Sequence, residues 1–133
     1  MRRAITRAVA TIAGVAIVAG AFVVVRDQLQ SRPERDDPSS VDFARVRVQT
    51  RLGLDADTAI EGVWAYCHTT VDGTRLARPI ARIDDDVFEL VLEPSMGSQA
   101  RRRFTGCVND GIVDRARTEL ESIERVPRAE AGL

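Results

Sequence analysis

Apolar and polar side chains alternate strictly over residues 44–49. Ala44, Val46 and Val48 are apolar, whereas the residues that separate them are arginine or glutamine. A period of two is typical of a strand that buries one face. We therefore predict a first strand here.

The segment Val63–Val71 is dense in β-branched and aromatic residues, and it stops at Asp72-Gly73. Aspartate and glycine both tolerate the positive φ angles that a two-residue hairpin turn requires. We therefore predict an antiparallel pair formed by Val63–Val71 and Thr74–Ile83. Pro79 cannot donate a ladder hydrogen bond, so the returning strand lies at an edge or carries a bulge. Leu52–Glu61 stays ambiguous between a loop and a short helical turn capped at Asp57-Thr58.

Val87–Glu93 is the most strand-like run in the chain, with Phe88, Leu90 and Leu92 on one face, and it predicts another strand. After it the period becomes helical. Apolar side chains recur at i, i+4, i+7 and i+8 in Ala100, Phe104, Cys107 and Val108. This spacing predicts a helix that ends at Gly111 in a left-handed stop. Ile112–Val126 suits both periods, and we favour a strand because a sheet covered by one helix needs a further strand to complete its core.

Together these elements predict an α+β fold: a small antiparallel sheet of four or five strands with one helix packed on one face. We place this domain at residues 41–126. The polar stretch 27–40, broken by two prolines, is expected to be a disordered linker, and residues 127–133 a flexible tail.

Residues 1–26 carry the strongest localisation signal. Ala8–Val25 contains a single polar side chain and no charge, and it directly follows Arg2, Arg3 and Arg7. Eighteen helical residues span about 27 Å, close to the thickness of the hydrocarbon core. The arginines favour a cytoplasmic N-terminus, so we predict a single-pass signal anchor with the C-terminal domain outside the cell membrane.

The alternative is a cleaved secretory signal. A charged start, an apolar stretch and the small residues Ala19-Gly20-Ala21 also fit that pattern. Cleavage after Ala21 would leave Phe22–Val25 as an exposed apolar N-terminus, so we favour the uncut anchor. In both cases the domain is exported.

The net charge of −1 hides an asymmetry. Residues 1–26 hold four arginines and no acid, while the remaining chain holds 15 arginines and 20 acids. An acidic domain lacks the broad basic surface of a nucleic-acid binder, so we expect no nucleic-acid partner. Lysine is absent and alanine, valine, aspartate and glycine are abundant, which we interpret as the composition of a GC-rich bacterial genome.

The chain has two cysteines, Cys67 and Cys107. In the predicted strand, Cys67 lies on the face opposite to Trp64, Tyr66 and His68, and Cys107 lies on the apolar face of the helix. Packing the helix on the Cys67 face brings both sulfurs together. Because export places the domain in an oxidising compartment, we predict a Cys67–Cys107 disulfide. Two buried free thiols are the alternative; a zinc site with His68 has too few ligands.

The sequence offers little catalytic chemistry. It has one histidine, no lysine and no glycine-rich phosphate loop, so we expect no catalytic, metal or cofactor residues and no small-molecule substrate. The Asp84-Asp85-Asp86 run lacks the ligand spacing of a calcium loop and is interpreted as a solvated turn.

Two groups of residues are candidates for contact with a partner: the aromatic sheet face and the basic helix surface, comprising Trp64, Tyr66, His68, Arg101, Arg102 and Arg103. The sequence thus predicts a non-catalytic, membrane-anchored binding protein of the bacterial cell envelope, with an envelope or membrane-protein partner. The alternatives are a secreted effector or inhibitor released after Ala21, and a small hydrolase that uses His68.

Overall fold

The computed structural model describes residues 34–51, 53–111 and 116–133. The predicted signal anchor, with Arg2, Arg3, Arg7 and the apolar segment Ala8–Val25, lies outside these residues. Within the described ranges, no helix has the length and apolar character needed to cross a membrane.

The domain is built around an antiparallel five-stranded sheet in the order β2-β4-β1-β5, with β3 also paired to β4. The long strands are β1 (Ser40–Thr50), β4 (Val87–Glu93) and β5 (Ala116–Pro127). These three confirm the alternation at residues 44–49, the run at 87–93 and the choice of a strand for the end of the chain. The sheet confirms the α+β class.

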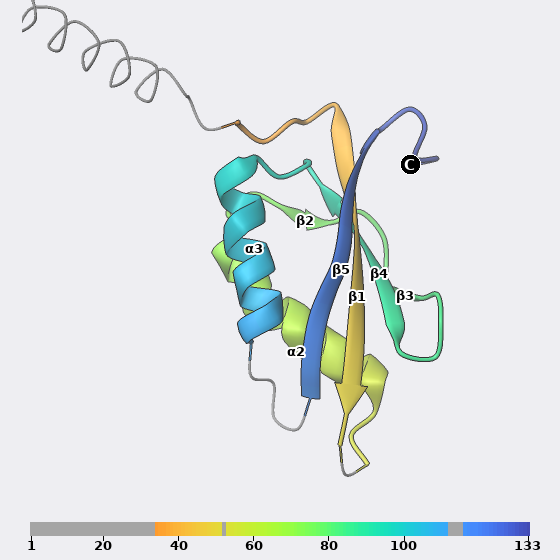
Figure 1. Ribbon diagram of the computed structural model, residues 1–133. Helices are drawn as coiled ribbons and strands as arrows, with labels where there is room; N and C mark the ends of the chain where they lie inside the picture. The colour runs from red at the N-terminus through yellow and green to blue at the C-terminus, as the bar shows by residue number, and fades with distance from the viewer. Residues whose placement is uncertain (1–33, 52, 112–115) are drawn as a thin grey trace, which may run out of the picture. The chain divides into compact units, whose positions relative to one another are not determined.

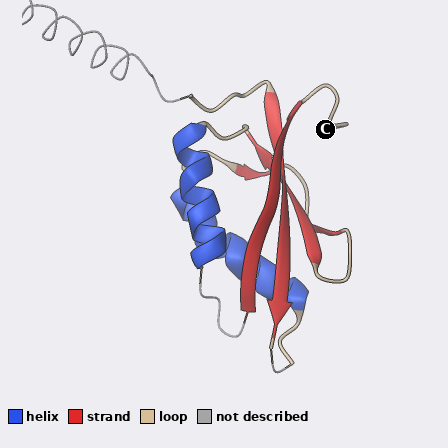
Figure 2. Ribbon diagram, in the orientation of Figure 1, coloured by secondary structure: helices blue, strands red, loops and turns tan. Residues whose placement is uncertain are grey.

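Two helices, rather than the single predicted helix, cover the sheet. They are α2 (Ala56–Cys67), which continues into the 3-10 helix η1 (His68–Thr70), and α3 (Ser98–Asp110). Helix α3 confirms the predicted 3.6-residue period. Figures 1 and 2 show both helices lying on the same side of the sheet.

The predicted strand Val63–Val71 is wrong, because this segment is the second half of α2 followed by η1. Asp55 caps the start of α2, because its side chain accepts a hydrogen bond from the Thr58 amide (3.0 Å). From there, Ala59, Ile60, Val63 and Cys67 are buried at helical spacing. Burial of this stripe outweighs the β propensity of the aromatic and β-branched residues.

The hairpin built on that strand is also wrong. Gly73 does adopt a positive φ of 80°, but the turn follows η1 instead of a strand. The returning segment forms only two short strands, β2 (Arg75–Leu76) and β3 (Ala81–Arg82), on either side of Pro79. This is consistent with the expected edge position of the proline.

The core lies between the helices and one face of the sheet. Its buried members come from both helices, from the inner faces of β1 and β4, from the residue after η1 and from the loop before α3: Ala44, Val46, Val48, Ala59, Ile60, Val63, Cys67, Val71, Phe88, Leu90, Leu92, Met96, Ala100, Phe104 and Val108. A single continuous cluster thus ties the two layers together.

Residues 34–39, which we call the lead-in segment, are held against the start of α3. The Glu34 carbonyl accepts the Ser98 amide (3.1 Å), and the Asp36 carboxylate accepts the Gly97 amide (2.7 Å). Asp37 forms an isolated antiparallel bridge with Ser95. The part of the expected linker that the structure describes therefore supplies backbone and side-chain caps for α3.

Helix α3 ends where predicted, but not by the predicted mechanism. Gly111 has φ −63° and is not left-handed. A Cβ at this position would lie 2.4 Å from the Cys107 carbonyl oxygen. Glycine is needed there because the backbone passes close to the last turn of the helix.

Candidate functional site

The disulfide between Cys67 and Cys107 is confirmed, with an S–S distance of 2.03 Å and a Cα–Cα distance of 5.7 Å. It joins two helices, whereas the sequence predicted a strand and a helix. Cys67 is the last residue of α2, and Cys107 lies in the last turn of α3. The bond therefore fixes the C-terminal ends of both helices to each other.

The structure does not gather Trp64, Tyr66 and His68 on one sheet face. Trp64 and His68 are four residues apart along the helix, and their ring centroids are separated by 5.8 Å. Trp64 also meets the core residue Phe104 edge to face, at 6.4 Å between centroids. The Tyr66 side chain is 66% exposed and lines a pocket described below. Of the predicted aromatic group, Tyr66 is therefore the best placed to contact a partner.

The three neighbouring arginines also separate. Arg101 donates to the carboxylate of Asp42 at 2.9 Å, and this carboxylate is fully buried. Arg102 and Arg103 are exposed. Arg103 lines a hollow of about 460 Å³ together with Asp36 and Asp72, among other residues. The predicted basic surface is therefore reduced to two exposed arginines, of which Arg103 shares a hollow with acids, and Arg101 belongs to an ion pair with a buried carboxylate.

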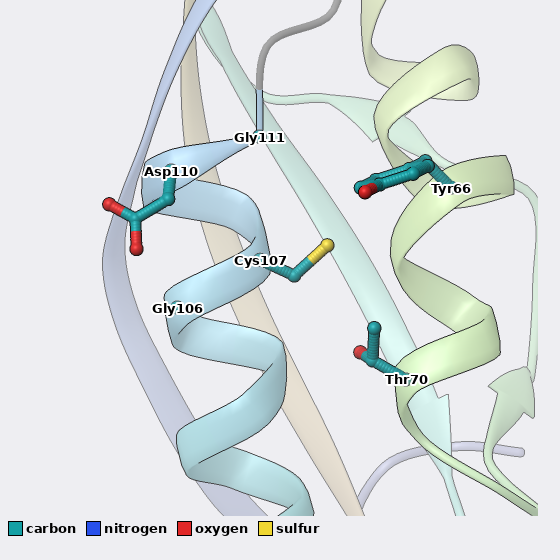
Figure 3. Close-up of a pocket in the computed structure, with 6 residues that line it drawn as sticks. All are labelled: Tyr66, Thr70, Gly106, Cys107, Asp110 and Gly111. Atoms are coloured by element: carbon teal, nitrogen blue, oxygen red, sulfur yellow. The ribbon is translucent and has the colours of Figure 1, made fainter.

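A pocket of about 540 Å³ lies between the two helices, beside the disulfide. Six residues from the ends of α2–η1 and α3 line it: Tyr66, Thr70, Gly106, Cys107, Asp110 and Gly111. Figure 3 shows the Cys107 sulfur pointing into the gap, with Tyr66 and Thr70 opposite, whereas the Asp110 carboxylate points away from Tyr66. We call this the interhelical pocket.

Gly106 adds no side chain to the α3 wall of the interhelical pocket. A Cβ built at this position meets no atom within 4 Å, so the missing side chain leaves accessible space on the α3 side. A glycine inside a helix costs about 0.5–1 kcal/mol relative to alanine. A glycine inside a helical pattern is by itself only a weak sequence signal of such a pocket.

The interhelical pocket lies at the negative ends of two helix dipoles. Neither α2 nor α3 has a basic residue in its last turn, and Asp110 adds a carboxylate at the rim. The last carbonyls of α2 are partly capped, because the Thr70 hydroxyl donates to Cys67 (2.7 Å) and the Thr69 hydroxyl donates to Tyr66 (2.8 Å). The electrostatic character of the pocket is therefore acidic.

A second polar centre is buried around Asp42, on the helix side of β1. Its carboxylate accepts the Met96 amide (2.7 Å) and Arg101, and lies 3.8 Å from Arg125. Burial raises the pKa of Asp42, against the opposing effect of the Met96 hydrogen bond and the two arginines. Arg125 also pairs with Glu34. This cluster joins β1, α3, β5 and the lead-in segment, and we assign it a structural role.

The sheet face opposite the helices carries charges arranged in three rows, which we call the charge triads. Each has a central residue between two partners of opposite sign: Arg75–Glu93–Arg128, Arg78–Glu89–Arg45 and Asp86–Arg47–Glu121. The guanidinium of Arg78 also stacks over Phe43, 5.5 Å from the ring centroid. This face is therefore polar, and the Arg78 side chain covers the apolar ring of Phe43.

Across residues 34–51, 53–111 and 116–133, no three His, Cys, Asp or Glu side chains are placed to hold a metal ion together. His68 lies at the surface, and its Nδ1–H donates to the Ala65 carbonyl (2.8 Å). In the Asp84-Asp85-Asp86 turn, the Asp84 carboxylate accepts a hydrogen bond from the Asp85 amide (2.8 Å).

Comparison with known proteins gives no further guide to the site. No protein-family model, curated protein or solved structure matches this chain. The interhelical pocket and the disulfide beside it are therefore interpreted from their own geometry.

Proposed function

We propose that this chain is a single-pass, membrane-anchored binding protein of the bacterial cell envelope, non-catalytic, with its C-terminal domain outside the membrane. The observation that carries the proposal is the Cys67–Cys107 disulfide. Structural disulfides persist in exported domains and are rare in the cytosol. The apolar segment Ala8–Val25, preceded by three arginines, supplies the matching export signal and membrane anchor.

The proposed contact surface is the interhelical pocket with Tyr66 at its edge. An exposed tyrosine beside a hollow is a good anchor for a protein partner, because it offers a large apolar ring with a polar tip. The charge triads on the opposite face already satisfy one another across the strands. The helical layer is therefore the more favourable surface for an envelope or membrane-protein partner.

Localisation is tested by the intact mass of the C-terminally tagged protein, recovered separately from membranes and from the medium. We expect a full-length membrane species whose mass increases by two hydrogen atoms on reduction, as one disulfide requires. A species in the medium that begins at Phe22 would overturn the anchor and favour the alternative, a secreted effector or inhibitor. Two free thiols before reduction would remove the support for export altogether.

The contact surface is tested by site-specific photocrosslinking in intact cells. A photoreactive phenylalanine analogue replaces Tyr66 in one variant and Ile83 in a matched control. Ile83 is also an exposed apolar residue, 46% accessible, but it precedes the turn between β3 and β4. We expect a discrete protein adduct from position 66 and none from position 83. Identical patterns from both positions would overturn the proposed surface.

A further inference from the structure

We propose that Cys107 is a thiol-exchange site, at which an incoming thiolate opens the disulfide through the interhelical pocket. The two sulfurs differ in accessibility. Cys67 is completely buried in the core, whereas Cys107 is partly exposed and lines the pocket. Figure 3 shows its sulfur directed into the gap between the helices. Thiol–disulfide exchange depends on which sulfur the attacking thiolate can reach.

The step is an exchange with balanced electrons. The thiolate RS⁻ attacks the Cys107 sulfur, a new RS–S bond forms, and the bond between the two protein sulfurs breaks. Cys67 leaves as a thiolate that takes up one proton. The product is a mixed disulfide on Cys107 with a free thiol on Cys67. A second thiolate then attacks the RS sulfur, forms RS–SR and releases Cys107 as a thiolate that takes up a proton. The complete reduction therefore consumes two thiols from the compartment that holds the domain, either two small molecules or the two cysteines of a protein dithiol.

The pocket has the shape that this reaction needs. A thiol must approach to bonding distance, and Gly106 offers no side chain to block it. Tyr66 and Thr70 form the opposite wall. No such access is provided at Cys67, which is enclosed by the core residues of both layers.

The charge around the pocket selects among thiols. The two helix C-termini and the Asp110 carboxylate disfavour an anionic reactant. A thiol that carries a positive charge next to its sulfur is favoured. The two reagents differ in thiolate fraction, so each rate with the folded protein is divided by the rate of the same thiol with the denatured protein. On this normalised scale cysteamine should react faster than 3-mercaptopropionate, which has similar size and opposite charge, and added salt should reduce the difference.

The site of attack is tested on the full-length protein in mild detergent. The protein is incubated briefly with cysteamine, quenched with acid and alkylated, and its tryptic peptides are mapped by mass. Cleavage at arginine separates Leu52–Arg75, with Cys67, from Phe104–Arg115, with Cys107. We expect cysteamine on the Cys107 peptide and the alkyl group on the Cys67 peptide. Equal labelling of both peptides, or cysteamine on Cys67, would overturn the proposal.

The route through the pocket is tested by filling it. Gly106→Leu places a side chain in the open space, and Arg102→Leu is the matched control on an exposed helical position outside the pocket lining. We expect Gly106→Leu to slow exchange severalfold in the folded protein, while Arg102→Leu leaves the rate unchanged. In denaturant the wild-type protein and both variants should react at the same rate. A Gly106→Leu variant that reacts as fast as wild type when folded would contradict this route.

The two sources of thiol are distinguished by the same assay. A purified thioredoxin-type dithiol protein replaces cysteamine, with its second cysteine changed to serine so that the mixed disulfide is trapped. A covalent complex through Cys107 identifies a protein thiol as a competent reactant. If cysteamine reacts and the protein does not, the site admits small thiols alone. If neither reacts with the folded protein, the proposal is wrong.

Discussion

At Gly97 the lead-in segment passes close to the start of helix α3. A Cβ built on Gly97 would lie 2.1 Å from the Glu34 carbonyl oxygen. Because that oxygen belongs to the backbone, Gly97→Ala must push the lead-in segment away from the helix. We expect a loss of about 1–3 kcal/mol in the free energy of unfolding, measured by urea denaturation. Faster hydrogen exchange at the Ser98 amide should accompany it, since this amide donates to Glu34.

The matched control is the same substitution at Gly106. There the added Cβ meets open space inside a helix, so Gly106→Ala should stabilise the protein by about 0.5–1 kcal/mol. If the two substitutions had the same effect, close approach of the backbone would not be the reason for glycine at position 97.

Asp42 gives the domain a distinctive pH dependence. Burial raises the pKa of this carboxyl above its ordinary value of 3.8, so the folded state binds the proton more tightly than the unfolded chain. Its contribution to stability is therefore fully present below the ordinary pKa and is lost as the pH rises through the folded-state pKa. Asp42→Asn has no such group. We expect the difference in unfolding free energy between wild type and variant to move in favour of wild type as the pH falls.

Asp37 and Asp55 supply the opposite case within the same molecule. Hydrogen bonds from Ser39 to Asp37, and from Thr58 to Asp55, lower the pKa of each carboxyl below 3.8. Their contributions are present above that value and are lost as the pH falls. Carboxyl resonances followed by NMR should therefore titrate at a higher pH for Asp42 than for Asp37 and Asp55. The reverse order would show that the two arginines outweigh the burial of Asp42.

At the scale of secondary-structure elements, the charge triads hold neighbouring strands in register on the solvent side. Glu89, whose side chain is 13% exposed, lies between Arg78 (2.8 Å) and Arg45 (3.8 Å). Glu89→Gln removes the central charge, and we expect a loss of about 1 kcal/mol in unfolding free energy at low salt. The loss should shrink at about 1 M salt, where the Debye length is about 3 Å.

Glu124→Gln is the control for that measurement. Glu124 is an exposed residue of β5, and among the described residues it forms no ion pair. Its substitution should leave stability unchanged at both salt concentrations. If Glu89→Gln proved equally neutral, the triads would be arrangements of surface charge without energetic consequence.

The elements also show where sequence reasoning works and where it fails. Strand β1 was predictable because it buries mainly one face, which leaves a period of two in the sequence. Strand β4 is buried on both faces, and it was predictable because Phe88, Leu90 and Leu92 recur on its core side. The segment Val63–Val71 misled because its β-branched and aromatic residues suit a strand, while its burial follows Ile60, Val63 and Cys67 along a helix. Local composition is the weaker guide in this segment, because tertiary burial decides whether it forms a strand or a helix.

The candidate site was predictable only through its covalent bond. Pairing Cys67 with Cys107 already implied that Tyr66, Thr70 and Gly106 lie near one another, since they flank the two cysteines in sequence. The wrong secondary structure at Cys67 concealed this consequence, because in a strand Tyr66 would point to the opposite face from Cys67. In the structure Tyr66 and Cys67 are consecutive residues at the C-terminal end of α2. Cys67 is bonded to α3, and Tyr66 lines the pocket next to α3.

At the scale of the whole molecule, the two faces of the domain have different characters. Figure 2 shows the helices on one side of the sheet, and the core lies beneath them. The other face holds the charge triads. In the part of the chain that the structure describes, the main core thus lies between two layers, and Val41, Val87 and Val91 are buried outside that core cluster. In so small a core the disulfide contributes a large share of the stability.

The disulfide therefore provides the strongest test of how the whole domain is stabilised. It closes a loop with a sequence separation of 40 residues. In the chain-entropy treatment, such a cross-link destabilises the unfolded state by about 4 kcal/mol. We expect reduction of the wild-type protein to lower its unfolding free energy by about that amount, measured by urea denaturation of the full chain with and without reductant.

The dependence on urea separates two explanations of that loss. If the disulfide acts on the unfolded chain, reduction lets the chain expand and expose more surface, so the m-value must rise. If it acts by holding α2 against α3 in the folded state, reduction lowers the midpoint without raising m. The Cys67→Ala, Cys107→Ala double variant resolves the remaining ambiguity, because it lacks the cross-link under all redox conditions. Its denaturation should be insensitive to reductant and should show the m-value of the reduced wild type; an m-value equal to that of the oxidised protein would contradict the entropic explanation.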